Sequence, residues 1–205
     1  MEHSDPHRII TEEQLDALLG TPHPRTRTKL LSALDEISIG FIKRSPLLVI
    51  GTADADGNQD VSPKGDHPGF VAVAGPKTLL VPERKGNKLK FGFRNVLANP
   101  HVGLIFLVPN SDETLRVNGT AELTADPAVL DSLPARGASA LLAMRVTVHE
   151  CFFHCGKAFI RSALWNPETW PVHTRVSFGK QLGGGGEDLA RQIDQAIELD
   201  YKNNL

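Results

Sequence analysis

The sequence predicts a mostly β protein with flanking helices (α+β), in which antiparallel strands form a barrel or a sandwich. The chain holds six or seven short apolar segments, most of them joined by turn-rich connections of hairpin length. The few helical patterns between them do not alternate regularly with strands, which argues against a doubly wound parallel sheet. With 205 residues, of which 40% are hydrophobic, one domain can bury a sizeable core.

Two helices are expected before the first strand. Thr11 followed by Gln14 matches a capping box, which predicts a short helix over 12–19. A second helix is predicted over about 25–39, because apolar residues recur on one face. These apolar residues are Leu30, Leu34, Ile37 and Phe41.

The strands are expected mainly in hairpin pairs. The turn sequence DADGN, residues 54–58, joins the first two apolar segments, and Gly75 with Pro76 separates the next two. Since no clear linker and no internal repeat interrupts the series, we expect one domain over 1–205. The expected strands are 47–54, 59–65, 70–75, 78–83, 101–108, 114–124 and 140–150.

Further helices are expected between and after the strands. Apolar residues at helical spacing predict a helix over about 87–99, and Asp126 followed by Pro127 marks the start of a short one. A helix is also expected over about 155–165, and an amphipathic helix after the glycine run 183–186. The domain would then consist of N-terminal helices (1–40), the barrel (41–150) and a C-terminal helical extension (151–205).

The segment VPERKGNKLKFGFRN, residues 81–95, concentrates positive charge in a chain whose formal net charge is −2. Arg84 and Lys85 lie with Gly86 in the loop before the expected helix, where free backbone N–H groups and the helix dipole favour an anion. The sequence therefore predicts an anion site at this loop. For Lys88, Lys90 and Arg94, a solvated helix face is the simpler interpretation.

The anion is expected to be a small molecule rather than a nucleic acid. A pI near 6.4 provides no broad positive field, and aromatic residues that could stack on bases make up only 6% of the chain. No apolar run approaches the ~20 residues of a membrane-spanning helix, so we expect no membrane partner. The opening residues lack a secretory pattern and the chain has two cysteines, which favours a cytoplasmic protein.

The sequence HECFFHC, residues 149–155, does not have the spacing of a metal site. His149 and His154 are five residues apart instead of four, and no second cluster of ligands accompanies them. We therefore expect no metal ion and interpret Cys151 and Cys155 as buried free thiols.

Four stretches in matching order resemble the FMN-binding split-barrel family of pyridoxamine 5'-phosphate oxidase. They are DVSPKGDHPGFV (60–71), TLLVPERKGNKL (78–89), NVLANPHVGLIFLVP (95–109) and TLRVNGTAEL (114–123). The resemblance implies a split β-barrel of antiparallel Greek-key type and a homodimer with FMN at the subunit interface. It places Arg84 and Lys85 at the FMN phosphate and Arg116 at the cofactor, from the same or the partner subunit. The implied cofactor-binding residues are Ser62, Lys64, Arg84, Lys85, Asn87, Lys88, Asn95 and Arg116.

The C-terminal part departs from the members that oxidise pyridoxamine phosphate, because it lacks their Arg-Leu-His-like substrate signature. It is similar instead to FMN-dependent relatives that share its HCGKAF ending. On the expected helix Lys157 and Arg161 share one face, and Trp165 follows a turn later. These three could close over the flavin or bind an anionic substrate. A surface cation pair beside a packed tryptophan is the alternative.

The resemblance as a whole implies an FMN-dependent oxidoreductase that transfers hydride or electrons to or from a small-molecule substrate. Because the substrate signature is missing, we do not expect oxidation of pyridoxamine phosphate. Two alternatives remain: a protein that stores or senses flavin without turnover, and a relative that uses haem or a deazaflavin in the same barrel.

Overall fold

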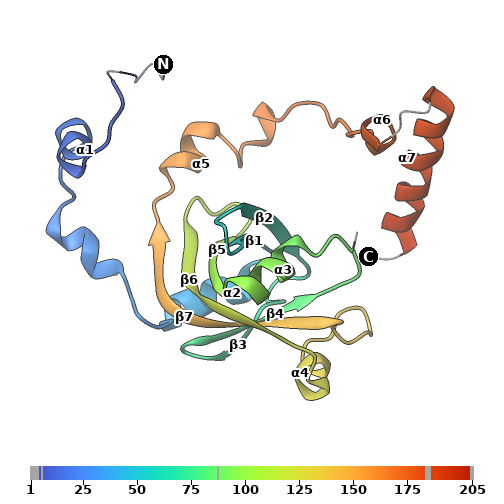
Figure 1. The fold of residues 1–205 in the computed structure, drawn as a ribbon, viewed down its shortest axis with the longest axis horizontal. Coiled ribbons are helices and arrows are strands. Elements are labelled where there is room, and N and C mark those ends of the chain that lie inside the picture. Colours follow the sequence, from blue (N-terminus) through green and yellow to red (C-terminus); the bar gives the residue numbers. More distant parts are fainter. Residues whose placement is uncertain (1–4, 6, 87, 183–185, 204–205) are drawn as a thin grey trace.

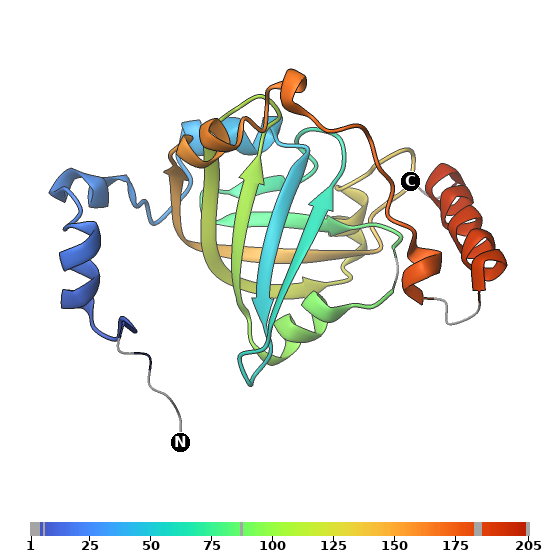
Figure 2. The ribbon, with the colours of Figure 1, turned by 90° about the horizontal axis from the view of Figure 1, so that it is seen from above.

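The computed structural model describes residues 5, 7–86, 88–182 and 186–203. Its centre is one seven-stranded antiparallel sheet that curls into a barrel (Figures 1 and 2). The predicted strands are confirmed, although the last one runs on to His154 and the third begins only at Ala72. The strands are β1 (Leu47–Ala53), β2 (Gln59–Gly65), β3 (Ala72–Gly75), β4 (Thr78–Glu83), β5 (His101–Leu107), β6 (Thr114–Thr124) and β7 (Leu142–His154).

The strand order is β2-β1-β5-β6-β7-β4-β3, so β2 and β3 are the two edge strands. The chain passes from one edge to the other between β2 and β3, and it returns from β4 to β5 through helix α3 (Phe91–Ala98). In Figure 2 the strands β1, β2 and β5 stand across β4 and β7, which gives the barrel its two crossing layers. The structure is therefore a split barrel and not a sandwich of separate sheets.

Alternating side chains fill the barrel. β1 and β5 each bury every second residue, as a strand with one face on a core does. Fully burying one such apolar side chain contributes about 1.5–3 kcal/mol, so the inward rows hold the barrel closed. The largest fully buried side chains are Phe106, Ile42, Leu48, Leu79, Leu104, Leu115, Val117, Val146 and Val148.

β6 and β7 form the longest ladder of the sheet, and it is interrupted by one bulge between Asn118 and Gly119. At this point the two backbones come very close. A Cβ atom added to Gly119 would lie 2.0 Å from the carbonyl oxygen of Thr147. Only a residue without a side chain fits the bulge.

The first helix, α1 (Glu12–Leu19), is confirmed with its capping box, but the helix predicted over 25–39 is wrong. A 3₁₀ helix, η1 (Pro24–Lys29), is followed by Leu31, which exchanges backbone hydrogen bonds of 2.8 and 3.0 Å with Cys151. Helix α2 (Glu36–Arg44) starts only after Asp35, whose carboxylate accepts a 2.8 Å hydrogen bond from the Ser38 N–H. The strand-like bridge and the N-cap together override the helical pattern.

Helix α3 also differs from the prediction, because it begins at Phe91 rather than near residue 87. Lys88 and Lys90 have φ angles of +62° and +61°, in the left-handed region that interrupts a helix. The cationic residues before Phe91 therefore belong to an irregular loop. We call residues 84–90 the basic loop; Asn87 lies outside the described residues.

A short helix, α4 (Pro127–Asp131), lies between β6 and β7. The C-terminal part consists of the short helices α5 (Lys157–Ser162), η2 (Pro167–Thr169) and α6 (Phe178–Leu182) and the long helix α7 (Gly186–Asn203). The Asp126 cap of α4 is confirmed. Helix α6 was not expected from the sequence; it is fixed to α7 by hydrogen bonds from the Ser177 hydroxyl and the Gly179 N–H to the Asp194 carboxylate, at 2.5 and 2.8 Å. Of the glycine run, residues 183–185 lie outside the described residues.

The N-terminal segment with α1 and the C-terminal pair α6–α7 extend to opposite sides of the barrel (Figures 1 and 2). In the described part of the chain, no helix combines the length and apolarity needed to cross a membrane. Of the two cysteines, Cys151 is buried as predicted, whereas Cys155 is exposed, because β7 ends beside it and the chain turns outward into α5.

Candidate functional site

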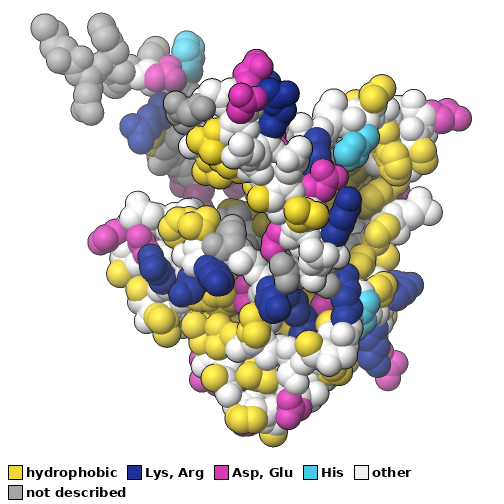
Figure 3. All heavy atoms as spheres, turned by 90° about the vertical axis from the view of Figure 1, so that its right-hand side faces the viewer, with side chains coloured by type: hydrophobic (Ala, Val, Ile, Leu, Met, Phe, Trp, Pro, Cys, Tyr) yellow, Lys and Arg dark blue, Asp and Glu magenta, His cyan; other side chains and the backbone are white. Residues whose placement is uncertain are grey.

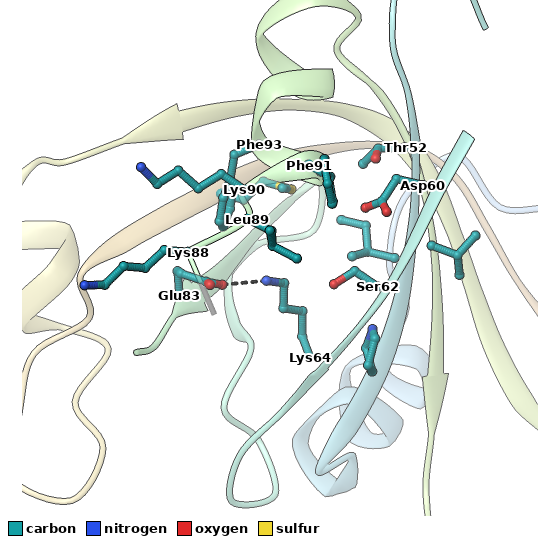
Figure 4. A pocket seen from close by; sticks show the side chains of 15 residues that line it. Thr52, Asp60, Ser62, Lys64, Glu83, Lys88, Leu89, Lys90, Phe91 and Phe93 are labelled. Atoms are coloured by element: carbon teal, nitrogen blue, oxygen red, sulfur yellow. Dashed lines mark hydrogen bonds and ion pairs between the residues drawn. The ribbon is translucent and has the colours of Figure 1, made fainter. Parts of the chain in front are cut away.

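Two adjoining cavities lie between β2 and the chain that follows β4, and Figure 4 shows the first of them. Their volumes are about 220 and 330 Å³, and they share Ser62, Pro63 and Lys64 of β2 and Glu83 of β4. We call the two together the β2 pocket. The first cavity is also lined by Thr52, Asp60, Lys88, Leu89, Lys90, Phe91, Phe93 and Met144, and the second by Asp66, Phe70, Arg84, Lys85 and Gly86.

The polar wall of the β2 pocket comes from strand β2. The half-buried residues of this strand are Asp60, Ser62 and Lys64, which share one face at the period of two that a strand imposes. A strand that turns polar side chains inward has no apolar core to cover at that point. The polar face of β2 is therefore suited to a polar ligand.

Lys64 is paired inside the pocket. Its Nζ lies 2.6 Å from Oε2 of Glu83, and the two side chains are only 20% and 25% exposed. The same ammonium group lies 4.9 Å from the centre of the Phe93 ring, within the range of a cation–π contact. Lys64 thus links β2 to the end of β4 and to α3, as the dashed line in Figure 4 shows for Glu83.

Arg84 is also held by its own chain. Its Nε donates a 2.9 Å hydrogen bond to Oδ2 of Asp66, and its Nη1 donates one of 2.9 Å to the Leu133 carbonyl. Burial alone would raise the pKa of the Asp66 carboxyl, but hydrogen bonds from the His67 N–H and from Arg84 hold that pKa below its ordinary 3.8. Arg84 therefore anchors the basic loop and keeps part of its guanidinium for a ligand.

The other lysines of the basic loop have no such partners. Lys85, Lys88 and Lys90 are exposed and form no ion pair with any residue that the structure describes. In Figure 4 the side chains of Lys88 and Lys90 point away from the first cavity, while Leu89 between them points into it. Lys85 lies beside the second cavity.

Helix α3 supports the remaining wall. Its Gly92 faces the strands: an added Cβ would make ordinary contacts, at 3.4 Å with Oδ2 of Asp60 and at 3.6 Å with Oγ1 of Thr52. Asn95 donates a 3.0 Å hydrogen bond to Oγ1 of Thr52. The predicted cofactor residue Asn95 thus ties α3 to β1 and is not among the residues that line the β2 pocket.

Arg116 lies on the outer face of the barrel, opposite Phe152 in the ladder of β6 and β7. Its Nε is buried yet has no hydrogen-bond partner among the described residues, and its guanidinium carbon lies 5.8 Å from the Phe152 ring centre. Burial, Arg116 and Lys29 together lower the pKa of the nearby His154. The Arg116 side chain as a whole is half-buried, so the rest of its guanidinium group is not enclosed by the barrel.

Three further predicted residues lie apart from the β2 pocket. Lys157 and Arg161 are exposed on α5, and the Trp165 ring stacks on Phe159 at 5.8 Å between centres. The Trp165 Nε1–H donates a 2.8 Å hydrogen bond to the Ser111 carbonyl, which fixes the ring to the β5–β6 connection. Within one chain the structure does not bring these residues to the β2 pocket (Figure 1).

Sequence analysis overlooked the carboxylates of the site. Glu83 and Asp66 pair with the two cations that were predicted to meet the ligand. Two of the carboxylates could have been found from the sequence: Glu83 directly precedes Arg84, and Asp60 alternates with the polar residues Ser62 and Lys64. The pairing of Arg84 with Asp66 spans 18 residues, so no local pattern could reveal it.

A sequence model of the pyridoxamine 5'-phosphate oxidase family matches residues 36–155, from the first residue of α2 to the residue after β7. This is more than half of the chain. The protein belongs to the pyridoxamine 5'-phosphate oxidase family. The match covers all seven strands and the basic loop, so the part of the chain that builds the β2 pocket is the part that defines the family. No curated protein matches the chain.

Several solved structures are similar in fold. HupZ from Group A Streptococcus is 18% identical, with a TM-score of 0.48, over 58% of this chain and 93% of that one. A candidate pyridoxamine 5'-phosphate oxidase from Lactobacillus delbrueckii is 26% identical, with a TM-score of 0.47, over 60% and 95%. HutZ from Vibrio cholerae, described as a heme storage protein, is 16% identical, with a TM-score of 0.43, over 58% and 93%.

Proposed function

We propose that the protein is an FMN-dependent oxidoreductase that transfers hydride or electrons to or from a small molecule. The observation that carries this proposal is the β2 pocket, in which a polar strand face meets a cationic loop in a member of the pyridoxamine 5'-phosphate oxidase family. Bound FMN would supply the redox chemistry, since its ring accepts and donates hydride.

The residues of the pocket fit the phosphate of FMN. A phosphate monoester carries close to two negative charges, which the unpaired Lys85 and the remaining N–H groups of Arg84 can meet. The Ser62 hydroxyl lies in both cavities and can donate a further hydrogen bond. Lys64 is held in place by Glu83, so its charge is positioned before any ligand arrives.

We further propose that the protein is a homodimer whose interface includes the outer face of β5 and β6. Gly103, Ile105 and Leu107 on this face are only half-buried in the single chain, and Arg116 lies beside Ile105 in the ladder. A partner subunit would cover the apolar row and bring its FMN beside the half-buried Arg116 side chain, as the family resemblance implies.

The visible spectrum of the purified protein tests the cofactor. FMN absorbs near ~450 nm, whereas haem absorbs more strongly near ~400 nm. Mass spectrometry of the released ligand separates FMN from a deazaflavin. If FMN is present but neither NADPH nor NADH reduces it, the alternative of a flavin-storing or flavin-sensing protein gains support. Finding haem or a deazaflavin instead would overturn the proposed cofactor.

Activity with pyridoxamine phosphate tests the class of reaction. We expect no turnover of this substrate by the FMN-loaded protein, because the C-terminal part lacks the substrate signature of the true oxidases. Production of pyridoxal phosphate, measured by its absorbance, would show that other basic residues hold the substrate phosphate. Arg175 and Lys180 would then be the first residues to replace.

A further inference from the structure

Another hollow adjoins the β2 pocket at the basic loop. The two share Glu83, Phe93 and the described residues of the loop other than Leu89. The volume of this hollow is about 590 Å³, within the range of small-molecule sites. The loop forms one wall, the first residues of β7 form another, and the end of α7 contributes Asp200. We call it the lysine pocket. Figure 3 shows lysine and arginine side chains gathered across the middle of this side of the molecule, between apolar side chains.

The backbone conformation of the basic loop orients two lysine side chains toward the lysine pocket. Lys88 and Lys90 both adopt positive φ, and Leu89 between them turns into the β2 pocket (Figure 4). Both lysines line the lysine pocket as well, and their ammonium groups extend away from the first cavity. A left-handed conformation at a residue other than glycine is strained, and such strain is typical of functional sites.

The lysine pocket has an excess of unpaired positive charge. Lys85, Lys88 and Lys90 all line it, and none forms an ion pair with a residue in the described part of the chain. Of the two carboxylates in its wall, Glu83 is already paired with Lys64 at 2.6 Å. Arg84 adds a further cation to the wall and Asp200 the other carboxylate, so the lining keeps an excess of positive charge, which favours an anionic ligand.

The lysine pocket also has an apolar wall. Leu141 is 60% exposed, and with Leu142 and Phe93 it faces the same hollow as the lysines. Phe93 lines the β2 pocket too, so an apolar group bound against it would lie next to the proposed cofactor. Apolar surface beside a few convergent polar groups is typical of small-molecule sites.

We propose that the lysine pocket binds the substrate, and that this substrate is a small organic anion with an apolar body. Lys88 and Lys90 hold the anionic group, and Leu141, Leu142 and Phe93 cover the apolar body. The role as substrate site rests on the proposed oxidoreductase function, whereas the binding of such an anion does not.

Octanoate is a suitable probe, because it joins one carboxylate to a short alkyl chain. We expect calorimetry on the full-length protein to show octanoate binding, little binding of octylammonium, and weaker binding of shorter carboxylates. Each methylene removed should weaken binding by up to about fourfold if its surface is fully buried. Equal binding of octanoate and octylammonium would overturn the assignment of the charge.

Two variants test the cationic wall and the apolar wall of the lysine pocket separately, and a third is the control. Lys88→Ala/Lys90→Ala should weaken octanoate binding at least tenfold, while Lys43→Ala/Lys77→Ala, which removes two exposed lysines elsewhere, should leave it unchanged. Leu141→Asn should weaken octanoate binding several-fold but leave acetate binding as it is. Octanoate affinity that is the same in all three variants and in the wild type would refute the proposal.

FMN content is measured on the same samples, so that the two proposals can fail separately. If FMN is bound but octanoate binding does not depend on Lys88, Lys90 or Leu141, the lysine pocket is not the substrate site, whereas the flavin proposal survives. If octanoate binds as expected but no FMN is found, the pocket stands as an anion site and the oxidoreductase function falls. Octanoate that lowers the rate of flavin reduction by NADPH would support both.

Discussion

Arg84 has a structural role and a proposed ligand-binding role, and a single substitution affects both. It is proposed to meet the FMN phosphate, yet it also carries the hydrogen bonds to Asp66 and to the Leu133 carbonyl. The Asp66 side chain is only 7% exposed, so it depends on this partner. Replacing Arg84 therefore changes the fold as well as the ligand site, and a loss of FMN alone would not identify its role.

We expect Arg84→Ala to lower the free energy of unfolding by about 1–3 kcal/mol, because it leaves a buried carboxylate with a lost hydrogen-bond partner. Urea unfolding of the ligand-free protein measures this loss. Lys85→Ala is the matched control, since Lys85 is exposed and has no ion-pair partner among the described residues; it should keep full stability and weaken FMN binding about tenfold. Equal stability of both variants would show that the Asp66 contact contributes nothing.

Asp66 predicts a pH dependence with a definite sign. Its folded-state pKa lies below 3.8, so its contribution to stability is present above that pH and is lost as the pH falls through the folded-state pKa. Asp66→Asn keeps the shape but removes the charge. We expect the wild type to exceed this variant in unfolding free energy near neutral pH, and by less as the pH drops below 3.8. A difference that grows in acid would contradict the ion pair.

At the level of elements, the strands and the capped starts of α1 and α4 could be predicted from the sequence, whereas the starts of α2 and α3 could not. Period-two alternation and turn residues are local signals, and 114–124 was placed to the residue. The helix over 25–39 failed because the bridge between Leu31 and Cys151 spans most of the chain. The start of α3 was misplaced because two lysines of high helix propensity adopt positive φ.

The structure brings Ser62, Lys64, Arg84 and Lys85 to one pocket, whereas their role in binding a cofactor, which the family resemblance implied, stays a prediction. Two of these cations are paired with carboxylates, and Arg116 points outward. Both features depend on how strands far apart in the sequence pair, and no local sequence pattern predicts such pairing.

The bulge in the β6–β7 ladder gives a prediction at the scale of the element. Gly119→Ala places a Cβ 2.0 Å from the Thr147 carbonyl oxygen, so the two backbones must separate. We expect a loss of about 1–3 kcal/mol in unfolding free energy. Gly40→Ala is the control: nothing lies within 4 Å of its Cβ and it sits inside α2, so it should gain up to ~1 kcal/mol. Thermal unfolding of both variants and the wild type measures this difference. A Gly119→Ala variant as stable as Gly40→Ala would contradict the prediction.

At the scale of the whole molecule, we expect sedimentation at micromolar concentration to give twice the chain mass of 22.3 kDa. Ile105→Asp puts a charge on the half-buried outer face of β5 and should yield a monomer that no longer retains FMN. Ile37→Asp is the control, because Ile37 is 70% exposed on α2. A wild-type monomer that binds FMN would place the whole site within one chain and exclude Arg116 of a partner.

Between β2 and the end of β4, the described residues form two ion pairs, Lys64 with Glu83 and Arg84 with Asp66. β2 lies at one end of the strand order and β4 next to the other end, so these pairs cross the open side of the sheet, which we call the seam. A ligand in the β2 pocket would contact both sides of this seam and would add to the interactions that hold them together. The ligand would then leave the pocket when the two sides separate. Occupancy should therefore be visible as slower amide hydrogen exchange in β2, and the rate at which the seam opens sets the upper limit for ligand release.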